Sequence, residues 1–173
     1  MDFRRKNRCF HQNTKRINYG GRQSLQVEFN VLGNACGGCR FHYFPYTAQI
    51  PILIEGKRES KTFNNLEDVW EVIDLLVEEV KENNAKGNEF DIAQSINAQL
   101  PFFTCANNMF DMSIQKDIQR YIYCKELGVS PYKGSYGEQP FRWVEKFFYI
   151  KSAFAKKESM QIDKSNMKAN KGN

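Results

Sequence analysis

The sequence predicts an α+β fold in which antiparallel strands come first and about four helices follow. Three observations support this prediction. Hydrophobic and polar residues alternate early in the chain, as they do in half-buried strands. Later segments repeat hydrophobic residues every three or four positions, which is typical of helices. Hydrophobic residues make up 41% of the 173 residues and aromatic residues 14%, which excludes a disordered chain.

The predicted strands lie between residues 24 and 63. In SLQVEFNVL, hydrophobic side chains occupy every second position, which predicts a strand with one buried face. The segment RFHYFPY, residues 40–46, is rich in aromatics that favour strands. The apolar run 50–54 and the turn at Glu55-Gly56 predict a hairpin that returns through residues 61–63. Together these segments predict three or four strands.

Helical periodicity begins after this hairpin. Asn65 can cap a helix over residues 66–80, and a shorter helix is expected from about residue 88 to Pro101. Ser113 is expected to cap a third helix that ends at Gly128. Pro140 suits the first turn of a fourth helix, in which aromatic and aliphatic residues recur at helical spacing.

Basic residues are concentrated near the two ends of the sequence. Residues 1–22 hold seven Arg or Lys and one Asp, and residues 151–173 hold six Lys and two acids, whereas the whole chain carries +5. We therefore expect a basic flexible arm at 1–22, a single α+β domain at 23–157 and a disordered basic tail at 158–173. The basic ends either bind a negatively charged partner or only keep the chain soluble.

The sequence CGGC, Cys36 to Cys39, is the strongest chemical feature. Two thiolates at this spacing can hold one side of a zinc ion. A structural zinc site would then take its other ligands from Cys105 and Cys124, with Cys9, His11 and His42 as further candidates. A redox role is disfavoured because a strand, not a helix, is expected after Cys39. The remaining interpretation is free thiols in a reducing compartment, with no cofactor.

The arm offers a second class of function, which is nucleic-acid binding. It interleaves basic side chains with Phe10 and His11, a composition that can contact phosphates and stack on a base. The basic candidates for contact with nucleic acid or with an acidic protein are Arg4, Arg5, Lys6, Arg8, Lys15 and Arg16. Such binding would weaken steeply as the salt concentration rises.

Enzymatic motifs are absent from the sequence. It contains no nucleophile elbow, Walker loop, H-E-x-x-H or dinucleotide fingerprint, and only two histidines. We therefore predict that the protein is not an enzyme. It also lacks a run of apolar residues long enough to span a membrane and lacks a secretory signal, so we expect a cytoplasmic location.

The connector VSPYKGSYGEQP, residues 129–140, combines turn residues with large aromatics. Pro131, Gly134 and Gly137 define turns, and Tyr132 and Tyr136 are expected to fold back on a neighbouring helix. A stiff loop of this kind either presents a protein-contact surface or only packs internally. Its candidate contact residues are Tyr132, Tyr136, Gln139, Pro140 and Trp143.

The stretch DIQRYIYCKELGVSPYKGSYGEQPFRWVEKFFYIK, residues 117–151, resembles a pattern in small uncharacterised proteins of tailed bacteriophages. In that pattern a short helix leads to a Gly/Pro loop, then to QP, then to a helix with an early aromatic. The positions that carry the resemblance are Gly128, Pro131, Tyr132, Gly134, Tyr136, Gln139, Pro140 and Trp143. Such proteins look as if they belong to the tail-assembly gene region, near the tape-measure gene.

The resemblance implies a virion component or assembly factor that acts through contacts with other phage structural proteins. We therefore expect a non-enzymatic structural or assembly protein, located in the host cytoplasm, in the virion or in both. The alternative is a small zinc-stabilised protein that binds nucleic acid through its basic arm. No membrane partner is expected.

Overall fold

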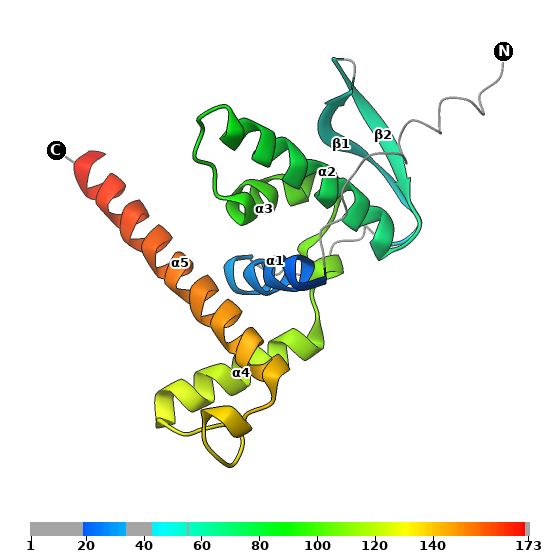
Figure 1. The fold of residues 1–173 in the computed structure, drawn as a ribbon. Helices are drawn as coiled ribbons and strands as arrows, with labels where there is room; N and C mark the ends of the chain where they lie inside the picture. Colours follow the sequence, from blue (N-terminus) through cyan, green and yellow to red (C-terminus); the bar gives the residue numbers. More distant parts are fainter. Residues whose placement is uncertain (1–18, 34–42, 55, 172–173) are drawn as a thin grey trace. The chain divides into compact units, whose positions relative to one another are not determined.

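The structure, a computed structural model, describes residues 19–33, 43–54 and 56–171 and confirms the α+β class (Figure 1). A two-stranded antiparallel sheet follows one helix and precedes the others, so the described residues contain fewer strands than the sequence predicted. The elements are α1 (Tyr19–Leu32), β1 (Tyr46–Ile54), β2 (Lys57–Phe63), α2 (Leu66–Ala85), α3 (Ile92–Phe103), α4 (Met112–Leu127) and α5 (Phe141–Lys171), with short 3-10 helices η2 (Ala106–Met109) and η3 (Tyr136–Glu138).

The contacts divide the chain into two compact units, and the single domain expected over residues 23–157 stays a prediction. Unit 1 contains the hairpin, α2 and α3, and comprises residues 1–20 and 36–108. Unit 2 contains most of α1 together with α4 and α5, and comprises residues 21–35 and 109–173. Unit 2 is thus assembled from two separate stretches of sequence, and the larger stretch of unit 1 lies between them in the chain.

The predicted hairpin of unit 1 is confirmed. Strands β1 and β2 pair in antiparallel register, with Tyr46 opposite Phe63 and Ile54 opposite Lys57. The Tyr46 and Phe63 rings stack with centroids 5.0 Å apart, and Phe63 in turn stacks on Phe103 of α3 at 6.2 Å. The Tyr46 hydroxyl donates a hydrogen bond of 3.1 Å to Thr104 Oγ1, so the polar tip of this buried ring is satisfied.

Helix α2 begins as the sequence predicted. The Asn65 side chain accepts hydrogen bonds from the backbone N–H groups of Glu67 and Asp68, which have no acceptor inside the helix. The Asp68 carboxylate accepts in return from the Asn65 N–H at 3.3 Å, which completes a capping box. The buried stripe of α2 then packs against α3 and the hairpin.

Helix α3 differs from its prediction at both ends. Asp91 caps it instead of a residue near 88, and the helix continues past Pro101 to Phe103. Pro101 lies in the last turn and is exposed, and without an N–H it cannot donate to the carbonyl four residues earlier, at Asn97.

The strand predicted at residues 24–32 is wrong, because these residues belong to α1. The alternation of hydrophobic residues has a second interpretation that the prediction missed. Leu25 and Phe29 are four residues apart, and so are Val27 and Val31, so each pair shares one side of a helix. All four side chains are buried. A helix covered on more than one side therefore produces the same period-two pattern as a half-buried strand.

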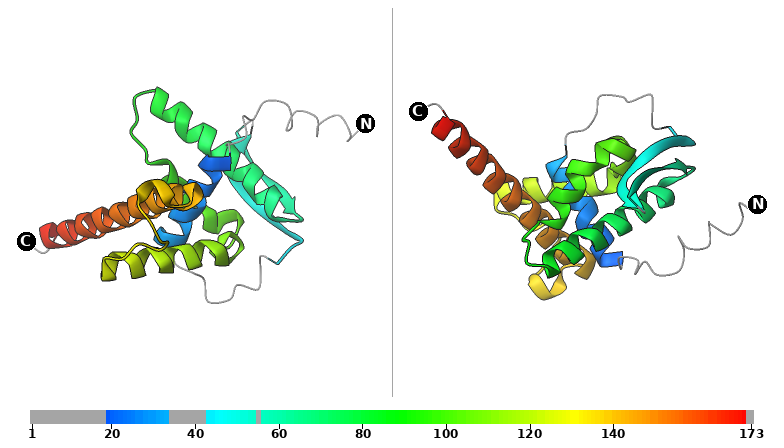
Figure 2. Two further views of the ribbon diagram at one scale, coloured as in Figure 1. Left: turned by 60° about the horizontal axis from the view of Figure 1, so that its bottom comes forward. Right: turned by 90° about the horizontal axis from the view of Figure 1, so that it is seen from above.

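The core of unit 2 lies among α1, α4 and α5. Figure 2 shows α4 and α5 side by side in its left view, and these helices contact each other. A cluster of buried side chains from all three helices fills the space between them: Val27, Val31, Ile114, Ile118, Tyr121, Trp143, Ile150 and Ala153. The predicted helical spacing of Trp143, Phe147 and Ile150 is therefore confirmed as the inward face of α5.

Two caps define α4. The sequence predicted Ser113 as its N-cap, but the Asp111 carboxylate holds that role and accepts hydrogen bonds from the N–H groups of Ser113 at 2.7 Å and Ile114 at 3.4 Å. Partial burial opposes ionisation of Asp111, yet these hydrogen bonds leave its pKa below the ordinary value. The predicted end at Gly128 is confirmed, since this residue has the left-handed φ of 63° of a helix C-cap.

Helix α5 continues to Lys171, so most of the expected disordered tail 158–173 is helical. Lys156 forms an ion pair of 2.7 Å with Glu28 of α1, and Lys157 Nζ donates to the Val31 carbonyl at 2.8 Å. The second contact places a cation at the carbonyl end of α1, where the helix dipole favours it. The disordered tail was predicted because hydrophobic residues become rare in this part of the sequence. A hydropathy pattern does not indicate polar contacts such as those of Lys156 and Lys157.

Candidate protein-contact site

The connector between α4 and α5 is an ordered loop built around turn geometry. Gly128 ends α4. Gly134 has a φ of 101°, a backbone conformation that residues with a side chain rarely adopt. A Cβ at Gly134 would lie 2.6 Å from Glu138 Oε2. Gly137 has no such constraint. Of the two glycines assigned to this loop by sequence, only Gly134 is required by the backbone.

The Gln139 side chain ties the loop together. Its amide Nε2 donates to the carbonyl oxygens of Tyr132, Gly134 and Ser135 at 3.2, 3.1 and 3.4 Å. Its Oε1 is buried and has no hydrogen-bond partner among the described residues, so the three donated bonds fix the orientation of the amide. One side chain thus contacts three carbonyl groups of the loop, of which that of Ser135 also accepts from the Glu138 N–H at 3.0 Å.

Glu138 fastens the middle of the loop. Its Oε2 accepts hydrogen bonds from the Ser135 backbone N–H at 2.7 Å and from the Ser135 hydroxyl at 3.0 Å. These two bonds hold the pKa of the exposed Glu138 carboxyl below its ordinary value. The carboxylate is therefore the form that the folded loop favours.

Arg120 of α4 holds the outer side of the loop. Its guanidinium donates a hydrogen bond of 3.0 Å to the Tyr132 hydroxyl. The guanidinium carbon also lies 5.5 Å from the centre of the Tyr132 ring and 5.4 Å from that of Trp143, within the range of cation–π attraction. Tyr132 and Trp143 meet edge to face at 6.3 Å. The prediction that Tyr132 folds back on a neighbouring helix is confirmed.

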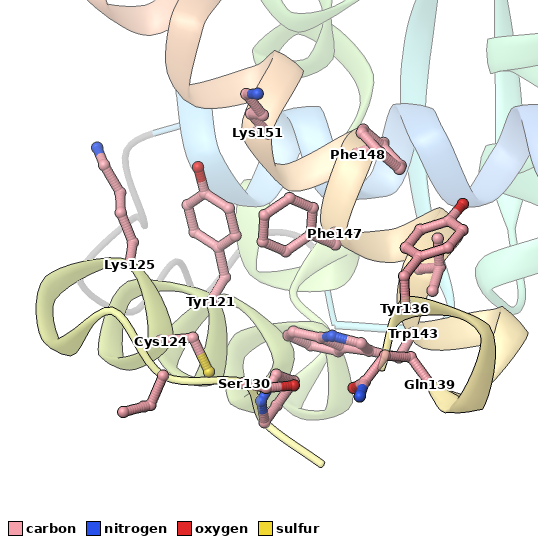
Figure 3. A pocket seen from close by; sticks show the side chains of 13 residues that line it. Tyr121, Cys124, Lys125, Ser130, Tyr136, Gln139, Trp143, Phe147, Phe148 and Lys151 are labelled. Carbon is pink, nitrogen blue, oxygen red and sulfur yellow. The ribbon is translucent and has the colours of Figure 1, made fainter. Parts of the chain in front are cut away.

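A pocket of about 510 Å³ opens between this loop and the two helices (Figure 3). Helix α4 contributes three lining residues, the loop five and α5 the remaining five. They are Tyr121, Cys124 and Lys125; Val129, Ser130, Pro131, Tyr136 and Gln139; and Trp143, Val144, Phe147, Phe148 and Lys151. Tyr121 packs on Phe147 at 5.1 Å, and Phe147 packs on Phe148 at 5.6 Å. The pocket is therefore walled largely by rings that brace one another.

The predicted contact residues divide between the pocket and its support. Tyr136, Gln139 and Trp143 line the pocket, whereas Tyr132 braces the wall from behind and Pro140 stands exposed before α5. The sequence prediction missed the parts of the wall that come from α4 and from later in α5. A signal for them existed, because Tyr121, Cys124 and Lys125 share one face of α4 by their three- and four-residue spacing.

The conditional zinc ligands are not brought together by the described residues. Cys36, Cys39 and His42 lie outside that part of the chain, as do Cys9, His11 and the arm residues Arg4, Arg5, Lys6, Arg8, Lys15 and Arg16. Cys105 is buried in unit 1, and Cys124 is buried in unit 2 beside the pocket. Within residues 19–33, 43–54 and 56–171, no three His, Cys, Asp or Glu side chains form a metal-binding group.

Protein-family models, curated proteins and solved structures were all compared with this chain, and none matches it. In the described ranges, no helix combines the length and the apolar character needed to cross a membrane. The inference about function therefore starts from the geometry of the pocket.

Proposed function

We propose that this protein is a non-enzymatic structural or assembly protein that binds another protein through the pocket of unit 2. The observation that carries the proposal is a preformed aromatic pocket whose loop is already held by its own hydrogen bonds. A surface that is ordered before binding loses less conformational entropy when its partner arrives. Tyr and Trp side chains in such pockets are also the residue types that dominate protein interfaces.

The exposed area around the pocket favours a protein partner over a small molecule. Tyr136 remains 74% exposed and Phe148 53% exposed, although both line the pocket. Apolar area thus extends beyond the cavity onto the surrounding surface. A small ligand would be largely enclosed, whereas a protein partner can insert one side chain and cover the rim with its neighbours.

The resemblance of residues 117–151 to small tailed-bacteriophage proteins supports a partner among virion or tail-assembly proteins. Both the loop and the first turns of α5, which build the pocket, lie in that stretch. The lining is dominated by aromatic and aliphatic side chains, which supports binding as the function of the pocket.

Selection of peptides from a random display library on the purified full chain tests the proposal. Selected peptides should bind the wild type and lose about tenfold or more in affinity with Phe148→Ser, because aromatic anchors contribute more than ~1 kcal/mol at such sites. Phe141→Ser is the matched control, since Phe141 is 74% exposed on the same helix and does not line the pocket. Circular dichroism confirms that both variants fold. The proposal fails if no peptide distinguishes wild type from Phe148→Ser.

A further inference from the structure

The chemistry of the pocket rim narrows the class of partner. Resting on the function proposed above, we infer that the pocket receives an apolar side chain of a partner polypeptide flanked by carboxylates. Among the described residues, the charged side chains that line the pocket are two lysines, Lys125 of α4 and Lys151 of α5. No acidic side chain of that part of the chain lines it.

Figure 3 shows where these lysines lie. Their ammonium groups and the Tyr121 hydroxyl appear along the same side of the pocket, whereas the Trp143 ring lies toward the other side. The pocket thus has an apolar interior with both ammonium groups along one edge, while the polar groups of Ser130, Tyr136 and Gln139 lie elsewhere on its rim. An apolar side chain can fill the interior while an adjacent carboxylate accepts from Lys125, Lys151 or Tyr121.

Among the described residues these two lysines form no ion pair, which is also true of other exposed lysines such as Lys116 and Lys168 but not of two lysines of α5. Lys146 and Lys156 lie on the same helix as Lys151, and they pair with Asp117 at 2.5 Å and Glu28 at 2.7 Å. Lys125 and Lys151 are exposed, and neither pairs with an acidic side chain in the described ranges. Unit 2 thus uses some lysines to hold its helices together and leaves the two beside the pocket available to a partner.

The observations favour an acidic polypeptide over nucleic acid. Affinity for nucleic acid depends mainly on several cations arranged along a phosphate backbone, whereas the pocket presents two. Its walls are also built for burial of one bulky apolar group. Two exposed lysines would instead favour acidic partners over others and raise the association rate. Burial of the apolar side chain would contribute most of the affinity.

The test compares peptides selected on the wild type with those selected on the Lys125→Glu/Lys151→Glu double variant. Wild-type peptides should carry Asp or Glu beside an apolar residue, and the double variant should lose that preference. Replacing these acids by Asn or Gln in the synthetic peptide should weaken binding about tenfold at low salt, because two exposed ion pairs are lost. The difference should shrink as salt rises.

A double variant with the same change in net charge serves as control. Lys116→Glu/Lys168→Glu alters one exposed lysine on each of the same two helices, away from the pocket, and should retain the acidic preference. Equal binding of acidic and amidated peptides would overturn this inference and leave the pocket proposal standing. Absence of any pocket-dependent peptide would overturn both. Displacement of the acidic peptide by a single-stranded oligonucleotide at lower concentration would overturn the choice of a polypeptide.

Discussion

Gly134 is the residue on which the geometry of the connector depends most directly. Its φ of 101° is unfavourable for any residue with a Cβ, and the space where a Cβ would stand is occupied by Glu138. That carboxylate is also the acceptor for Ser135. A side chain at Gly134 would therefore strain the backbone and displace the contact that fastens the loop.

Gly134→Ala should lower the free energy of unfolding by about 1–3 kcal/mol, the usual cost of a strained backbone position. Urea unfolding of the full chain measures this change. Gly137→Ala is the matched control: a Cβ there meets no atom within 4 Å, so its effect should remain within about 0.5 kcal/mol of zero or be slightly stabilising. If both variants unfold at the same urea concentration, the loop does not require the left-handed glycine.

At the scale of the element, the helices show what local sequence can and cannot indicate. Asn65 and Gly128 were identified as caps because their side-chain chemistry or backbone freedom suits one position in a helix. The hairpin was identified by its turn for a similar reason. Helix α1 was not, since two buried i, i+4 pairs and a half-buried strand give the same alternation. The pattern was ambiguous, and the burial on several sides that decides it comes from tertiary packing.

The cap of α4 provides a test at this scale. Asp111→Ala should destabilise unit 2 by about 1 kcal/mol. The backbone N–H groups of Ser113 and Ile114 donate to the Asp111 carboxylate and would lose their acceptor. Ser113→Ala, the change at the residue that the sequence suggested as the cap, should have a smaller effect. Thermal unfolding of the two variants under identical conditions gives the comparison, and a larger loss for Ser113→Ala would contradict the assignment of Asp111.

The candidate site was only half predictable for a related reason. Gly and Pro, whose backbone conformations are distinctive, indicated the loop in the sequence. Three of the candidate residues named there line the pocket: Tyr136, Gln139 and Trp143. Lys125 and Lys151 were not found, because a solvated lysine on a helix has no distinguishing local pattern. Their relation depends on how the connector turns the chain between α4 and α5.

At the scale of the whole molecule, the division into two units has a measurable consequence. Each unit holds one of the two tryptophans, Trp70 in unit 1 and Trp143 in unit 2. Both are 5% exposed, so each reports on its own core. The division was not predictable from local sequence, because the Lys156–Glu28 contact that helps define unit 2 joins residues 128 positions apart.

Ile150→Ala should destabilise unit 2 by about 2–5 kcal/mol, since Ile150 is fully buried in its core. With 5-fluorotryptophan incorporated, fluorine NMR during urea unfolding follows both tryptophans in one sample. The Trp143 signal should change at a lower urea concentration than in wild type, and the Trp70 signal should shift less. Ile96→Ala in unit 1, which is also fully buried, should reverse this order. Equal shifts of both signals in both variants would show that the two units unfold as one.

The position of residues 36–108 of unit 1 between the two stretches of unit 2 also determines the order in which the described elements are synthesised. Helix α1 is synthesised before the other described elements, but the α5 lysine that binds Glu28 follows 128 residues later. Unit 1 can complete its core in the interval, because all its described elements precede α4. The aromatic pocket can form only after Lys151, its last wall residue in the sequence, has emerged. A nascent chain therefore cannot form the pocket before both helices that wall it have been synthesised, whereas the described core of unit 1 requires neither of them.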